Sequence, residues 1–307
     1  MAAFVIYATH FLVDFHPEYE YFFDEGVTSW FLNGVSGKLC VAFFGVCLGY
    51  FAYLSKEKNP TKYIMRRYFY FFFCGLLINT IISLYRILNG RQGFDLFTVL
   101  VTSLSLGDKI YPTYWCIVPF FLASVLSYIN GQAKVSCTGI LFQIVFLYIL
   151  DEEWISICLL GAVAAVIINN HIPIFKNWLV KFFITAVIFF AIKRPESKET
   201  FLLNGLCSAA LLIVVENSSS LQKILSVPFF ANQGKNVMAI FLIHPLIYTI
   251  LGNYLMNKYY LPYGIRFLVT MTICWIVIIL ISYPLTSLIN KTMDLFNRQL
   301  VRYVKET

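Results

Sequence analysis

Apolar segments that approach the length of a membrane-spanning helix recur along the whole of this chain. A helix needs roughly 17–25 mostly apolar residues to cross a hydrocarbon core about 30 Å thick. We predict ten spans, near residues 1–15, 36–54, 68–85, 112–129, 136–150, 154–169, 178–192, 200–216, 236–256 and 265–290. No polar stretch between them is long enough to form the core of a soluble domain. The sequence therefore predicts an all-α integral membrane protein with about ten transmembrane helices in one bundle.

The composition agrees with this class. Hydrophobic residues make up 59% of the chain, charged residues make up 13%, and the mean hydropathy is +0.74. Soluble domains contain about 45–50% apolar and about 25% charged residues. An ordinary soluble protein is therefore excluded.

Lysine and arginine are more frequent on one side of the predicted spans. With a cytoplasmic N-terminus, 14 of the 23 basic residues fall in inner loops and the C-terminal tail: Lys56, Lys58, Lys62, Arg66, Arg67, Lys134, Lys176, Lys181, Lys223, Lys235, Lys291, Arg298, Arg302 and Lys305. This bias predicts that both termini are cytoplasmic. The net charge of +7 fits inner loops that face anionic membrane lipid, so we expect no nucleic-acid partner.

The two ends of the chain differ from ordinary spans. Residues 1–15 would form only about 22 Å of helix, so we expect either a tilted first helix or a true start further upstream. Residues 291–307 carry basic and apolar side chains at helical spacing. We predict a transmembrane domain at 1–290, followed by a cytoplasmic amphipathic tail at 291–307 that lies along the inner membrane surface.

The eight cysteines lie singly within apolar stretches. They form no CxxC pair and have no histidine at metal-ligand spacing. We interpret them as packing residues and expect neither disulfides nor a metal site.

Two histidines lie inside predicted spans, where ionisable groups are costly and are candidates for function. His10 is followed by Asp14 on the same helical face, where a carboxylate could orient the imidazole as a general base. A histidine wetted by the outer membrane interface explains the same residues equally well. His244 precedes Pro245, which should kink the helix and free backbone acceptors, either around a cavity or as a purely structural feature.

Basic and aromatic groups mark the ends of two other spans. Lys62, Arg66 and Arg67 lie at the inner end of the third span, where guanidinium groups could bind phosphate or simply set the topology. Tyr111, Tyr114 and Trp115 lie at the outer end of the fourth span. Such residues form interfacial belts, and they also stack on sugar rings.

Taken together, five segments resemble the acyltransferase 3 family, whose mostly bacterial, ten-helix membrane proteins move acyl groups onto surface glycans. They are "VIYATHF", "GKLCVAFFGVCLGYF", "YIMRRYFYFF", "YPTYWCIVPFFLASVLSYI" and "GKNVMAIFLIHPLIY", in the family's order. The resemblance covers nearly the whole chain, although each motif is weak by itself.

The sequence departs from the family pattern at two places. The family's arginine upstream of the first-helix histidine would here precede Met1. In the third span, Arg66 and Arg67 are present, but Phe69 and Tyr70 stand where a second arginine is expected. These departures predict altered donor binding.

The resemblance implies an O-acyltransferase with no permanently bound cofactor. Acyl-CoA, typically acetyl-CoA, would be the cytoplasmic donor, with its phosphates on Arg66, Arg67 and Lys62. His10 would be the base and His244 would shape a polar conduit, while a glycan acceptor would lie near Tyr111, Tyr114 and Trp115. Asp14 as the residue that orients His10 is an inference from spacing, not from the family.

Two other classes of protein fit parts of the sequence. A non-enzymatic carrier or glycolipid flippase also uses kinked helices and buried charges, but we detect no internal repeat of the kind common in carriers. A glycan polymerase would favour a large, arginine-rich outer loop. The longest outer loop, 86–111, contributes only Arg86, Arg91 and Lys109.

Overall fold

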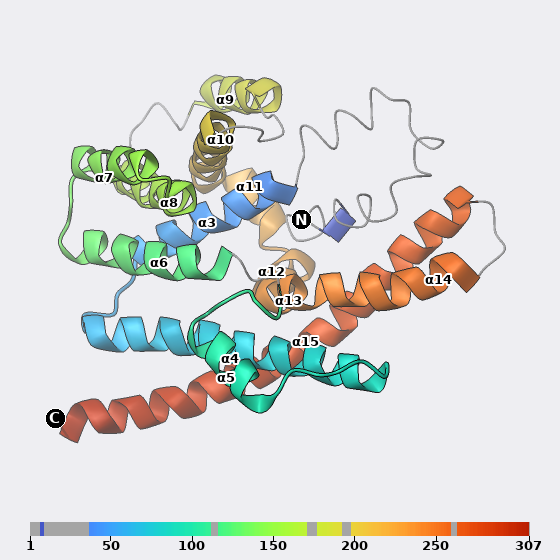
Figure 1. Cartoon of the computed structure of the whole chain (residues 1–307). Coiled ribbons are helices and arrows are strands. Elements are labelled where there is room, and N and C mark those ends of the chain that lie inside the picture. The colour runs from blue at the N-terminus through green and yellow to red at the C-terminus, as the bar shows by residue number, and fades with distance from the viewer. Residues whose placement is uncertain are drawn as a thin grey trace.

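Every regular element in the described part of the chain is a helix (Figure 1). The computed structural model describes residues 7–8, 37–111, 116–170, 177–191, 198–258 and 263–306. The helices are α3 (Gly37–Tyr53), α4 (Pro60–Leu88), α5 (Leu96–Leu104), α6 (Ile117–Gln132), α7 (Cys137–Ile149), α8 (Glu153–Asn169), α9 (Trp178–Ala191), α10 (Lys198–Glu216), α11 (Ser219–Leu225), α12 (Pro228–Lys235), α13 (Val237–Ile247), the π-helix η4 (Tyr248–Gly252), α14 (Asn253–Lys258) and α15 (Tyr263–Glu306). Within these ranges the predicted all-α class is confirmed.

Four helices in the described ranges are long and apolar enough to cross a membrane. They are Pro60–Leu88, Glu199–Glu216, Val237–Lys258 and Ile265–Leu300, and they indicate a membrane protein. Five more predicted spans coincide with apolar helices of 10–17 residues, which are short for a 30 Å hydrocarbon core. The first predicted span lies outside the described residues except at 7–8. The described part therefore contains fewer full-length spans than the ten expected.

Helix α8 is covered by other helices of the protein rather than by lipid. Residues 155–165 of this helix are all buried, and α3, α6, α7 and α10 pack around it (Figure 1). A helix that is apolar on every side needs burial, and neighbouring helices provide burial as well as lipid does. The apolar character of α8 is therefore accounted for by packing within the protein.

Close backbone approach between α3 and α8 depends on glycine. A Cβ atom built on Gly161 would lie 1.9 Å from the carbonyl oxygen of Val46 and 2.6 Å from the backbone nitrogen of Tyr50. On the other helix, a Cβ atom on Gly49 would lie 1.9 Å from the carbonyl oxygen of Cys158. Small residues of this kind let apolar helices pack at short range. All eight cysteines are free thiols, and Cys158 is among the buried ones that contribute to this packing.

A second group of helices surrounds α15, a single helix of 44 residues and about 66 Å. Helices α14, α13 and α4 contact it in turn along its length (Figure 1). The buried Tyr7 also docks on α15, because its hydroxyl donates to the carbonyl of Met271 at 2.7 Å and its ring stacks on Trp275. Helix α15 joins the predicted span 265–290 and the predicted tail without a break.

Replacing Gly161 with alanine should lower the melting temperature in detergent. Alanine is favoured over glycine in a helix by about 0.5–1 kcal/mol, but overpacking against rigid backbone costs about 1–3 kcal/mol. Gly234→Ala in α12 is the matched control, since a Cβ atom there meets nothing within 4 Å. Equal melting temperatures for the two variants would show that α3 and α8 do not approach this closely.

Candidate functional site

The predicted basic cluster lies within the first turns of α4. Asn59 caps this helix, because its Oδ1 accepts the backbone N–H of Lys62 at 3.0 Å, and Pro60 follows at the first helical position. The helix therefore begins eight residues before the predicted span at 68. This start places Lys62, Arg66 and Arg67 on a rigid helix rather than in a loop.

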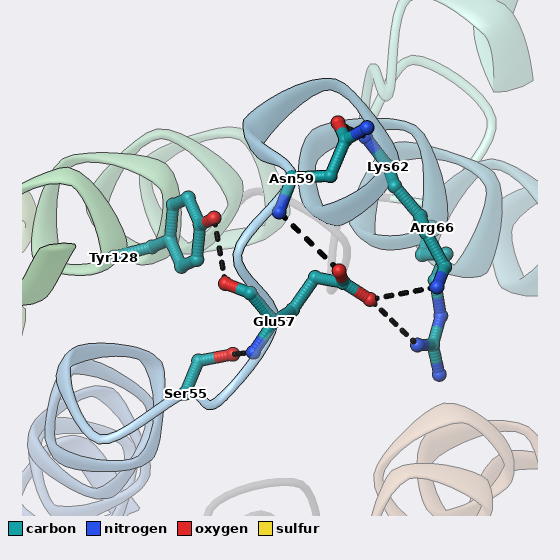
Figure 2. Close-up of polar contacts among 6 residues, drawn as sticks. All are labelled: Ser55, Glu57, Asn59, Lys62, Arg66 and Tyr128. Carbon is teal, nitrogen blue, oxygen red and sulfur yellow. Dashed lines mark hydrogen bonds and ion pairs between the residues drawn. The ribbon is translucent and has the colours of Figure 1, made fainter. Parts of the chain in front are cut away.

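Glu57, in the loop between α3 and α4, organises the groups around this helix start (Figure 2). Its Oε2 lies 3.0 Å from Lys62 Nζ and 3.9 Å from Arg66 Nη1, and its Oε1 accepts the Asn59 backbone N–H at 3.3 Å. The hydrogen bond from Lys62 is the main cause that holds the pKa of the Glu57 carboxyl below its usual value. Glu57 thus compensates part of the positive charge of the cluster.

The backbone of Glu57 is fixed as well. Its carbonyl oxygen accepts the hydroxyl of Tyr128, from α6, at 2.8 Å, and its N–H donates to Ser55 Oγ at 3.4 Å (Figure 2). Glu57 is not among the residues predicted for the site. A usable signal was present, since it is the only carboxylate between Gly37 and Phe94.

Arg67 is held by an aromatic pair. Its Nε donates to the hydroxyl of Tyr63 at 3.3 Å, and its guanidinium carbon lies 5.6 Å from the centre of the same ring. Tyr63 stacks on Tyr128 with ring centres 3.9 Å apart. A guanidinium placed over an aromatic ring keeps its remaining N–H groups available for a ligand.

Arg66 and Arg67 line one cavity of about 660 Å³, called here the arginine cavity. Three parts of the chain form its wall: Ser55 and Glu57 from the loop; Tyr63, Arg66, Arg67 and Tyr70 from α4; and Asn290, Met293, Asp294 and Asn297 from α15. The volume is in the range of small-molecule and cofactor sites. Lys62 is not among the lining residues and faces Glu57 instead.

Helix α15 supplies a wall of this cavity because it packs on α4. Phe296 stacks on Phe69 with ring centres 3.9 Å apart and planes inclined by 7°. Phe69 is one of the two residues that stand where the sequence comparison expected an arginine, and its neighbour Tyr70 lines the cavity. The predicted apolar face of the tail is thus covered by protein at Phe296, and Leu300 is buried too.

The second candidate region surrounds His244, which is only 1% exposed. Pro245 has no N–H for the carbonyl of Phe241 four residues back, and His244 Nδ1 lies 2.9 Å from that same oxygen. It also lies 3.2 Å from the carbonyl oxygen of Ile240. Because carbonyl oxygens only accept, Nδ1 carries a proton, and in the neutral ring Nε2 then holds the lone pair. The acceptor freed by the proline is therefore bound by the adjacent imidazole.

The helix changes its winding directly after this pair. The π-helix η4, Tyr248–Gly252, follows α13, and short π-helical segments occur frequently at functional sites. Tyr111 approaches from the α5–α6 connection, and its hydroxyl donates to the carbonyl of Leu242 at 3.0 Å. Tyr111 is only 7% exposed, so it supports α13 and does not belong to an exposed interfacial belt.

The structure thus brings Arg66 together with Arg67, and Tyr111 together with the His244 helix. His244 does not line the arginine cavity. His10, Asp14, Tyr114 and Trp115 lie outside the described residues. The α15 side chains of the cavity are not among the predicted site residues, although Asn290, Asp294 and Asn297 recur at the i, i+4, i+7 spacing of one helical face.

No family model, no curated protein and no solved structure matches this chain. The likeness to the acyltransferase 3 family accordingly depends on the five sequence segments.

A double-mutant cycle tests the role of the His244 ring. His244→Ala should lower the free energy of unfolding by about 1–3 kcal/mol, because it leaves the Phe241 carbonyl buried without its ring donor. In a Pro245→Ala background the restored N–H can bind that carbonyl, so the same change should cost less. Denaturant unfolding in detergent measures both values. An equal cost in the two backgrounds would mean that the imidazole does not serve this carbonyl.

Proposed function

We propose that this protein is a membrane O-acyltransferase of the cell membrane. It moves an acyl group, acetyl in the simplest case, from cytoplasmic acyl-CoA to a hydroxyl of a surface or lipid-linked glycan. The proposal includes ten spans in one bundle with both termini cytoplasmic, as expected of an enzyme that resembles the acyltransferase 3 family in a bacterial plasma membrane.

One observation carries this proposal. The two arginines predicted to bind the donor line one cavity, large enough for a cofactor-sized ligand, at the end of a helix that has the length of a span. Guanidinium groups bind phosphate oxygens through paired, charge-assisted hydrogen bonds. The phosphates of acyl-CoA would lie on Arg66 and Arg67.

Glu57 sets a condition on donor binding. Its carboxylate already contacts Lys62 and lies near Arg66, so an incoming phosphate competes with it for the same cations. A phosphate carries more negative charge and more acceptor oxygens than a carboxylate. Displacement of Glu57 would then release Lys62 toward the donor, which gives that lysine its predicted place in binding.

The chemistry assigned to His10 is general base catalysis. The imidazole takes the proton from the acceptor hydroxyl while the hydroxyl oxygen attacks the thioester carbonyl. The carbon–sulfur bond breaks, the thiolate of CoA leaves and takes up a proton, and an ester remains on the glycan. Asp14 would hold the histidine tautomer. The acceptor would lie near Tyr114 and Trp115.

His244 has a supporting role in this scheme. Its Nδ1 proton is engaged by backbone carbonyls, so the neutral ring has Nε2 as an acceptor, on the helix that continues through η4. Tyr111 keeps this helix in place. His244 and the kink at Pro245 would shape the wall of a polar conduit between donor and acceptor.

A carrier or glycolipid flippase is the second candidate. A spanning segment interrupted by a π-helix, with a buried histidine beside the interruption, also fits a translocation path. Such a protein would move its substrate without forming a new covalent bond.

Replacing Arg66 and Arg67 together with glutamine should weaken acyl-CoA binding by at least about a hundredfold, since each charged hydrogen-bond donor contributes about 1.5–3 kcal/mol. Titration calorimetry on the purified protein in nanodiscs measures this change. Arg298→Gln is the matched control, because Arg298 is exposed and does not line the cavity. Unchanged affinity in the double variant would leave the arginines with a topological role only.

Mass spectrometry of the surface glycan distinguishes the enzyme from the carrier. Cells with the wild-type protein should carry an acyl mass that mild base removes, and His10→Ala should abolish it at equal membrane abundance. His171→Ala, in a predicted loop, is the matched histidine control. Glycan that is moved but has no added ester would support the carrier instead.

A further inference from the structure

The wall of the arginine cavity formed by α15 has a different chemistry from the wall formed by α4. Asn290, Asp294 and Asn297 recur on one helical face and line the cavity that Arg66 and Arg67 line from the other helix. The α4 side offers N–H donors suited to an anion. The α15 side adds a carboxylate and two amides.

Two details show that the α15 wall offers acceptors to a ligand. Asn297 Oδ1 is buried and has no hydrogen-bond partner among the described residues. The ion pairs of the described residues join Glu57 to Lys62 and Arg66, so the Asp294 carboxylate forms no ion pair within that part of the chain. A buried acceptor without a donor costs about 1–3 kcal/mol, and a turn of the Asn297 side chain toward a ligand donor in the cavity would remove this cost.

A simple anion does not fit both walls. Phosphate or pyrophosphate would bind Arg66 and Arg67 but would leave Asn297 Oδ1 without a donor and would be repelled by Asp294. A phosphate ester with hydroxyl or amino groups near the phosphate satisfies both sides. Carboxylates bind sugar hydroxyls in this way in nucleotide sites, where an acidic residue accepts from the ribose.

We infer that Asp294 and Asn297 bind hydroxyl or amino donors that flank a phosphate, so that the arginine cavity selects a phosphate ester bearing such donors over a simple anion. Two sources supply this chemistry at a membrane surface: a soluble nucleotide, and a lipid headgroup that carries a phosphate and glycerol hydroxyls. The nucleotide source rests on the proposed function, because it corresponds to the nucleotide end of acyl-CoA.

Calorimetric titration of the full chain in phosphatidylcholine nanodiscs tests this inference with ADP and inorganic pyrophosphate as probes. Asp294→Asn should weaken ADP binding by about tenfold, since a charge-assisted hydrogen bond becomes a neutral one. The same variant should bind pyrophosphate equally well or more tightly, because a repelling charge is removed. Asn297→Leu should weaken ADP binding while pyrophosphate binding stays unchanged.

Asp108→Asn is the control, because it removes an exposed carboxylate that does not line the cavity and should change neither affinity. Asp294 is exposed, so its replacement leaves the packing of α15 intact. If Asp294→Asn raises the affinity for both probes alike, or changes neither affinity, the Asp294 carboxylate does not bind donor groups of the ligand. The inference is then overturned.

Native mass spectrometry of protein released from phosphatidylglycerol or phosphatidylcholine nanodiscs tests the lipid source. Retention of phosphatidylglycerol that Asp294→Asn abolishes, together with absent ADP binding, would support the inference with a lipid as the ligand. That result would at the same time remove the acyl-CoA site from the proposed function. If neither ADP binding nor phosphatidylglycerol retention depends on Asp294 and Asn297, the inference fails whether or not the protein acylates a glycan.

Discussion

The contact between Phe69 on α4 and Phe296 on α15 holds together two helices that are far apart in the sequence. Aromatic rings stacked at this distance bury a large apolar area and fix the helices at one separation. The arginine cavity lies beside this contact and takes its walls from both helices. Without the packing of α15 on α4, Arg66 and Arg67 would mark only the end of a span. With it, they face a polar wall across an open cavity.

The site combines strong charges with groups that moderate them. Glu57 lies against Lys62 and near Arg66, and Asp294 faces the cavity from α15, so the arginines are not an uncompensated basic patch. A balanced arrangement of this kind favours ligands that match its pattern of donors and acceptors over ligands that merely carry charge. The His244 region is a separate polar feature. In it, the His244 imidazole binds the backbone carbonyl that Pro245 leaves without an N–H donor.

Sequence patterns predicted the helices well and their environments poorly. The apolar segments near 136–150 and 154–169 coincide with α7 and α8, but apolarity alone does not distinguish lipid from protein as the covering medium. The start of α4 was placed too late because Lys62, Arg66 and Arg67 dilute the apolar window, although Asn59 and Pro60 are ordinary signals for a helix start.

The candidate site was predicted from one side only. Arg66 and Arg67 are predicted from the sequence, because two adjacent arginines at the end of an apolar segment form a local pattern. The opposing wall of α15 and the role of Glu57 depend on which helix packs on which, and no local pattern contains that information. Likewise, Pro245 predicted a freed carbonyl, but the binding of that carbonyl by His244 follows from the side-chain geometry.

Photoaffinity labelling with an acyl-CoA analogue is the most direct measurement of the central claim, which is that α4 and α15 together bind the donor. Peptide mapping of the labelled protein should find the probe on both the segment around Arg66 and the segment 290–297, with labelling suppressed by excess unmodified acyl-CoA. Labelling confined to other helices, or insensitive to competition, would contradict the claim.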